Sequence, residues 1–183
     1  MTSDRASGAD PSLVVVCGLP GVGKTTVAER VAERTHGRLL RTDVVRKQRH
    51  DEPTYSAAET RDVYRAVLEQ ARETIQDGRT AVLDATFRTS DLRERAKALA
   101  DYLAVEFELL HVACDESVVE ERIAGRESDA SDADFAVHLQ LRDEFEPVDL
   151  DHEVIDNSDG LDRTHRQVDR LFGGPRQRDL RDL

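Results

Sequence analysis

Short apolar runs alternate with segments of helical periodicity along most of this 183-residue chain. The apolar runs expected to form strands are 13–17, 38–42, 80–84, 105–113 and 153–155. Apolar residues recur at helical spacing over 26–35, 56–77, 90–102, 115–125, 134–145 and 161–172. Alternating strands and helices are typical of a parallel sheet covered on both faces. We therefore expect an α/β fold of three layers around five mostly parallel strands.

The polar segments at the two ends predict one domain over residues 13–172. Residues 1–12 have neither a basic start nor an apolar stretch, so we expect a disordered tail rather than a signal peptide. Residues 173–183 form a second polar tail. No apolar run approaches the roughly 20 residues that span a bilayer. These features predict a cytoplasmic protein without a membrane partner.

Between the first apolar run and the first helix, the chain reads Gly-Leu-Pro-Gly-Val-Gly-Lys-Thr. This is the complete phosphate-binding loop motif, in the strand-to-helix setting that the motif requires. The alternative, a glycine-rich turn that binds nothing, does not explain why motif and setting coincide. The residues expected to bind a nucleoside triphosphate are Gly18, Leu19, Pro20, Gly21, Val22, Gly23, Lys24, Thr25 and Thr26.

The residue types in this loop match the chemistry of a triphosphate. Backbone N–H groups of the loop and the positive end of the following helix attract phosphate oxygens. Lys24 is expected to reach the β- and γ-phosphates, and the Thr25 hydroxyl to hold Mg²⁺. We therefore expect a site for a nucleoside triphosphate and Mg²⁺.

The charge of the chain favours some partners over others. It carries 26 basic and 38 acidic residues, a net charge of −12, and only three of the basic residues are lysines. An acidic, lysine-poor composition is typical of halophilic proteins, which suggests a haloarchaeal source. It also disfavours broad nucleic-acid binding, which needs a basic face. The two cysteines and six histidines show no metal-ligand spacing, and we assign them no chemical role.

Two aspartates follow predicted strands, where ligands bind in open α/β sheets. Asp43 follows the second strand and is either a base that accepts a proton from an attacking hydroxyl or a helix N-cap. Asp84 ends the third strand, where an acidic residue commonly orients Mg²⁺. Hydrolytic motor ATPases often carry Glu at the next position, but this chain has Ala85.

Arg122 and Arg126 share one face of a predicted helix that leads into an Asp/Ser-rich segment. Arginines on a mobile flap can neutralise the charge that develops on a transferred phosphoryl group. The alternative is a solvated helix face paired with neighbouring glutamates. Spacing alone leaves both interpretations open.

With these motifs placed, the chain resembles the small P-loop kinase-like ATP-binding proteins. That group includes zeta toxins, polynucleotide kinases, chloramphenicol phosphotransferase, and gluconate or adenylylsulfate kinases. The subgroup it most resembles is the ATP-binding domain often fused to aminoglycoside-phosphotransferase-like domains. The segments that carry the likeness are GLPGVGKTT (18–26), TDVVRK (42–47), VLDATF (82–87), ERIAGR (121–126) and DASDAD (129–134).

The resemblance implies a kinase that uses ATP and Mg²⁺, with a short helical lid over about residues 122–134. It implies that Asp43 is the base and that Arg46 holds the acceptor. It also implies that Asp84 belongs to the Mg²⁺ or substrate shell and that Arg122 and Arg126 are lid arginines. Residues 48–55 match no acceptor signature, so the hydroxyl acceptor and the oligomeric state stay open.

Two alternatives to a small-molecule kinase remain at the level of sequence. A polynucleotide 5′-hydroxyl kinase would use the local basic cluster of residues 41–49. A nucleotide-binding regulatory ATPase would hydrolyse ATP without a phosphoryl acceptor. Ala85 weakens this second alternative. A toxin that phosphorylates a cell-wall sugar nucleotide would require an antitoxin partner.

Overall fold

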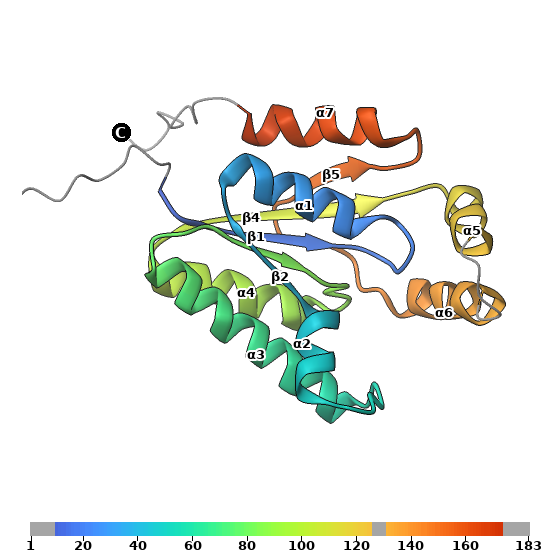
Figure 1. Cartoon of the computed structure of the whole chain (residues 1–183), viewed down its shortest axis with the longest axis horizontal. Helices are drawn as coiled ribbons and strands as arrows, with labels where there is room; N and C mark the ends of the chain where they lie inside the picture. Colours follow the sequence, from blue (N-terminus) through green and yellow to red (C-terminus); the bar gives the residue numbers. More distant parts are fainter. Residues whose placement is uncertain (1–9, 126–130, 174–183) are drawn as a thin grey trace, which may run out of the picture.

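A computed structural model of the chain describes residues 10–125 and 131–173. Its centre is one five-stranded sheet in the order β2-β3-β1-β4-β5, and every neighbouring pair is parallel (Figure 1). The strands are β1 (Ser12–Cys17), β2 (Arg38–Arg41), β3 (Ala81–Asp84), β4 (Glu106–Ala113) and β5 (Glu153–Asp156). The expected α/β fold with five strands is confirmed, and the sheet is entirely parallel.

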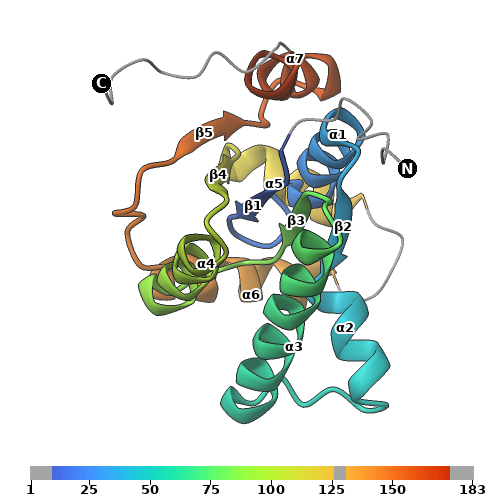
Figure 2. The ribbon, with the colours of Figure 1, turned by 90° about the vertical axis from the view of Figure 1, so that its left-hand side faces the viewer.

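Helices cover both faces of this sheet (Figure 2). The helices are α1 (Lys24–Thr35), α2 (Thr42–Arg49), α3 (Ala57–Gln76), α4 (Ser90–Leu103), α5 (Glu116–Ala124), α6 (Ser131–Glu144) and α7 (Leu161–Phe172). Apolar residues of α1 and α7 pack on one face, and those of α3 and α4 pack on the other. Among the described residues, no helix is long and apolar enough to cross a bilayer.

The alternation of side chains along β1 explains the two cores. Val14 and Val16 face α1 and α7, whereas Leu13 and Val15 face α3 and α4, and all four are fully buried. A central parallel strand buried on both faces reads as a continuous apolar run, as this one does. The carboxyl ends of the strands point toward α5 and α6 (Figure 1).

Several boundaries differ from the expectation, and α6 begins at Ser131, three residues earlier than expected. β1 begins at Ser12, which the sequence analysis placed in the tail, because the Ser12 backbone N–H and hydroxyl both lie within hydrogen-bond distance of the Thr80 hydroxyl. Thr42 is not in a strand and begins α2, a helix that was not predicted. Residues 1–9 and 174–183, the outer parts of the expected tails, lie outside the described residues.

Helix α3 begins directly after Ser56, within one residue of the expected start. The Ser56 side chain caps the helix by accepting a hydrogen bond from the Glu59 backbone N–H at 3.2 Å. In a full capping box the Glu59 carboxylate would return to Ser56. Here it accepts two 2.7 Å bonds from the Thr54 N–H and hydroxyl and pairs with Arg46. Helix α2 is thereby attached to the start of α3.

Candidate functional site

The phosphate loop occupies residues 18–23, between the end of β1 and the start of α1. Gly18 has φ 143°, and a Cβ there would lie 2.6 Å from the Val112 carbonyl oxygen. Gly23 has φ 91°, and a Cβ there would collide with the Asn157 amide. Only glycine fits both positions, because the backbone is left-handed and neighbouring atoms fill the space. The loop shape therefore depends on its fixed glycines.

Two side chains from distant elements hold the loop from outside. The Asn157 amide, just after β5, donates to the Val22 carbonyl at 2.7 Å and accepts from the Thr164 hydroxyl at 2.6 Å. His138 on α6 places Nδ1 2.7 Å from the Pro20 carbonyl oxygen, and its ring stacks on Phe135. Both residues are buried. These contacts engage carbonyls of the loop and not its N–H groups, although the Gly18 N–H donates to the Thr86 carbonyl at 3.2 Å.

Lys24 is the first residue of α1, and its Nζ donates to the Leu19 carbonyl at 2.9 Å. Burial lowers the pKa of this ammonium, while the carboxylates of Asp84 and Asp43 act to raise it. Both carboxylates therefore lie near enough to Lys24 to act on its charge. Among the described residues this buried cation has a carbonyl as its hydrogen-bond partner, and it is suited to receive phosphate oxygens.

Asp84 ends β3 beside the start of α1, as the sequence predicts. Its carboxylate is 6% exposed, and its Oδ2 accepts a 2.7 Å hydrogen bond from the Thr25 hydroxyl. The same oxygen lies 3.3 Å from Arg41 Nε, and Arg41 Nη2 donates to Thr25 Oγ1 at 3.5 Å. The hydroxyl and carboxylate assigned to Mg²⁺ are thus adjacent, and an arginine that the sequence analysis left outside the site is in contact with both.

Thr25 and Asp84 suit Mg²⁺ in donor type. Mg²⁺ prefers oxygen ligands and is usually bound by one or two carboxylates together with substrate phosphates. Over residues 10–125 and 131–173, no group of three or more His, Cys, Asp or Glu side chains is arranged to hold a metal. A magnesium ion here would therefore depend on the nucleotide for its remaining ligands.

Asp43 and Arg46 lie on α2, which follows β2 directly. Asp43 is exposed in the first turn, and Arg41 occupies the N-cap position, so the N-cap alternative for Asp43 is wrong. Arg46 is buried, pairs with Glu59 and lies 4.7 Å from the Tyr55 ring centroid. The Asp43 carboxylate is therefore accessible to a ligand, whereas the Arg46 guanidinium is already paired with Glu59.

Arg122 lies on α5 beside the phosphate loop. Its Nη2 donates to the Asn157 carbonyl at 2.8 Å, and its Nη1 lies 3.4 Å from Cys114 Sγ. A Cβ on Gly23 would lie 3.8 Å from Nη1. The alternative of a solvated helix face paired with glutamates is therefore wrong for Arg122. Arg126 and the rest of 126–130 lie outside the described residues.

Sequence reasoning missed three residues of this site: Arg41, His138 and Asn157. Asn157 is the single asparagine of the chain, and its place two residues after a predicted strand could have drawn attention to it. His138 carried no such signal, because its partner is a backbone carbonyl 118 positions away. Each of these contacts depends on the order of strands in the sheet, which the local pattern does not encode.

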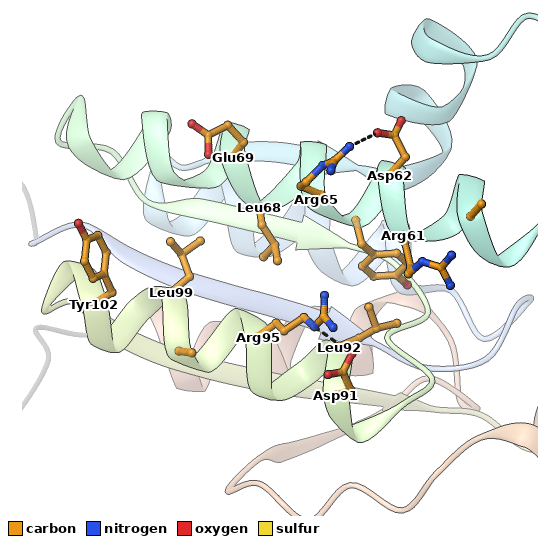
Figure 3. Close-up of a pocket in the computed structure, with 13 residues that line it drawn as sticks. Arg61, Asp62, Arg65, Leu68, Glu69, Asp91, Leu92, Arg95, Leu99 and Tyr102 are labelled. Atoms are coloured by element: carbon orange, nitrogen blue, oxygen red, sulfur yellow. Dashed lines mark hydrogen bonds and ion pairs between the residues drawn. The ribbon is translucent and has the colours of Figure 1, made fainter.

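A groove of about 690 Å³ lies elsewhere, between α3 and α4 (Figure 3). Leu68, Leu92 and Leu99 line its apolar part, and the ion pairs Arg65–Asp62 and Arg95–Asp91 lie along it. None of its lining residues belongs to the phosphate loop. We therefore do not assign it to the candidate nucleotide site.

Solved structures with a similar fold include two kinases. Adenylylsulfate (APS) kinase CysC of Mycobacterium tuberculosis, in complex with AMPPNP and APS, has TM-score 0.72 at 15% identity, over 90% of this chain and 99% of that chain. A gluconokinase from Sinorhizobium meliloti 1021 has TM-score 0.65 at 18% identity, over 91% and 95%. At these identities the likeness establishes a P-loop kinase-like fold.

Two sequence relatives match most of this chain. Protein Rv2004c of Mycobacterium tuberculosis is 29% identical over 154 residues, which cover 78% of this chain and 31% of the relative. This chain thus spans about a third of the length of such mycobacterial relatives. UPF0200 protein PAE1629 of Pyrobaculum aerophilum is 24% identical over 88% of this chain and 97% of the relative. A family model described as an AAA domain matches residues 13–148, and the chain belongs to this family, AAA_33.

Proposed function

We propose that this protein is a kinase that transfers the γ-phosphoryl group of ATP to a hydroxyl of a small-molecule or nucleotide-like acceptor. One arrangement carries the proposal. A complete phosphate loop, the adjacent Thr25–Asp84 pair and the exposed Asp43 carboxylate meet at the carboxyl end of the sheet. We interpret these as a donor site, a cation site and a candidate base, and their position at one edge of the sheet supports phosphoryl transfer.

On this proposal the loop N–H groups and Lys24 hold the triphosphate. Lys24 exchanges its hydrogen bond to the Leu19 carbonyl for bonds to phosphate oxygens. Thr25 and Asp84, which are hydrogen-bonded to each other, would hold Mg²⁺. When bound, this ion would neutralise charge on the phosphate oxygens. The protein itself contributes mainly by fixing positions, since Asn157 and His138 hold the loop before any ligand arrives.

Asp43 is the candidate for the base that orients the acceptor hydroxyl and takes its proton. Its exposure at the start of α2 leaves it free to meet an acceptor. Because Glu59 engages Arg46, we assign Arg46 to fixing α2, and hence Asp43, rather than to gripping the acceptor directly. Arg122 is already beside Gly23 and supplies positive charge there. The lid over about 122–134 would bring in Arg126 and exclude water.

The two alternatives have less support. A polynucleotide kinase needs a free basic surface, yet Arg41, Arg46 and Arg49 are each paired with a carboxylate of the same chain. A regulatory ATPase needs a means to activate water, and Ala85 stands where motor ATPases often carry Glu. We also propose kinship with the ATP-binding domain that is often fused to aminoglycoside-phosphotransferase-like domains. The longer mycobacterial relatives are consistent with this kinship.

The test is an acceptor screen that follows ADP release. Because the composition is typical of halophilic proteins, the screen is run at both high and low salt, with aminoglycosides, sugars, nucleosides and 5′-hydroxyl oligonucleotides. The proposal expects one class to stimulate ADP release in the wild type and not in the Asp43→Asn variant. Slow ADP release that no acceptor stimulates would instead favour the regulatory ATPase. Stimulation by oligonucleotides alone would favour the polynucleotide kinase.

A further inference from the structure

Arg41 and Asp84 end neighbouring strands and are register partners across the β2–β3 pair. Partners in parallel register point to the same face of a sheet, here the face covered by α1, on which Thr25 lies. The guanidinium therefore converges on the same two oxygen atoms that would hold Mg²⁺. Its Nε is 3.3 Å from Asp84 Oδ2, and its Nη2 is 3.5 Å from Thr25 Oγ1.

These contacts engage one oxygen of each residue proposed to bind the metal. Asp84 Oδ2 accepts a hydrogen bond from the Thr25 hydroxyl and lies 3.3 Å from Arg41 Nε. Arg41 Nη2 donates to Thr25 Oγ1, the atom whose lone pair a magnesium ion would need. A guanidinium and a divalent cation repel each other at such distances, so both cannot occupy this place at once.

Arg41 is held mainly by charge, because its hydrogen bond to Thr25 Oγ1 is long at 3.5 Å. Its Nε is buried and has no partner of hydrogen-bond geometry, although Asp84 Oδ2 is within ion-pair distance. Its side chain is 37% exposed, so it has a route outward. An arginine held mainly by charge at a partly open position can be displaced by a stronger cation.

We propose that Arg41 is an internal placeholder cation. It neutralises Asp84 in the nucleotide-free protein, excludes free divalent metal from Thr25 and Asp84, and leaves when the metal arrives with a nucleotide. This inference rests on the proposed use of Mg²⁺ at these two residues. It makes metal occupancy conditional on the nucleotide, because only the complex brings the phosphate oxygens that complete the ligand set.

The test is a titration of the nucleotide-free full chain with Mn²⁺. The electron paramagnetic resonance signal of free Mn²⁺ measures how much of the ion is bound. Because the chain is strongly acidic, the site is defined as the binding that Asp84→Asn removes. The Arg41→Gln variant should bind Mn²⁺ at this site roughly tenfold or more tightly than the wild type. Arg38→Gln, at the other end of β2, makes the same change of charge and should leave the affinity unchanged.

Equal Mn²⁺ affinity in Arg41→Gln and Arg38→Gln would overturn the proposal. The proposal would also be overturned if the tighter Mn²⁺ binding of Arg41→Gln persisted in the Arg41→Gln, Asp84→Asn double variant. If Arg41→Gln fails to fold, Arg41→Lys serves instead. The lysine ammonium can contact one oxygen at a time, whereas the arginine guanidinium contacts two. Arg41→Lys should therefore bind Mn²⁺ severalfold more tightly than the wild type, and an unchanged affinity would overturn the proposal. The measurement needs no phosphoryl transfer. A failed acceptor screen would therefore overturn the proposed function and leave this result standing.

Discussion

Asn157 gives a direct test of how the fold supports the phosphate loop. Its amide joins the Val22 carbonyl on one side and the Thr164 hydroxyl on the other, and it is 5% exposed. Asn157→Ala leaves the buried Val22 carbonyl without this bond, whereas the Thr164 hydroxyl keeps its 3.2 Å bond to the Gly160 carbonyl. We expect the free energy of unfolding to fall by about 1–3 kcal/mol, the cost of one unsatisfied buried group. For a domain of this size the melting temperature should fall by roughly 2–12 °C.

The same change should also weaken ATP binding, because the loop would spend less time in the shape that accepts phosphates. If the competent fraction falls to about a tenth, the apparent dissociation constant rises about tenfold. Thermal unfolding by circular dichroism and titration calorimetry with an ATP analogue measure the two effects. Thr164→Val is the matched control, since it removes one bond of Asn157 and leaves the bond to Val22. Wild-type ATP affinity in Asn157→Ala would refute a role in shaping the loop.

Three further predictions concern the remaining parts of the site. Lys24→Ala should abolish ATP binding in calorimetry, and undiminished affinity would remove the loop lysine from the account. Asp43→Asn should keep ATP affinity near that of the wild type while slowing transfer by roughly 10²–10⁴; a lower melting temperature with unchanged turnover would make Asp43 structural only. Burial by itself raises the pKa of Glu59, but hydrogen bonds from Thr54 and Arg46 outweigh it and lower the pKa to about 2. A carboxylate with a lowered pKa stabilises the fold above its ordinary pKa of 4.5 and loses that contribution as the pH falls toward 2. The melting-temperature gap between the wild type and Glu59→Gln should therefore narrow between pH 6 and pH 3, and a constant gap would contradict the assignment.

The fold could be predicted largely from sequence because local patterns specify it. Buried strands read as apolar runs, and α7 begins and ends where its periodicity places it, at Leu161 and Phe172. Helix α2 was missed because it is short and its order depends on distant partners. Arg46 pairs with Glu59, and Arg49 pairs with Asp62, both on α3. Such tertiary ion pairs leave no periodic signal in an eight-residue segment.

The candidate site likewise combines residues that the local sequence predicts with residues that it does not. The phosphate loop is encoded by contiguous residues, so its position and its glycines could be predicted. The supports of the loop come from residues far along the chain, and the strand order brings them together. Arg41 meets Asp84 only because β2 and β3 are neighbours in register. Whether Asp43 serves as the base depends on an acceptor that the protein alone does not specify.

The central claim is that the γ-phosphoryl group of ATP passes to a hydroxyl. Phosphorus NMR of the wild type with ATP, Mg²⁺ and the acceptor pool tests it most directly, since a phosphoester and inorganic phosphate give separate signals. The account predicts a new phosphoester signal that grows with ADP and is absent with Lys24→Ala. Inorganic phosphate as the sole product beside ADP, or a phosphoester that forms equally well with Lys24→Ala, would contradict it.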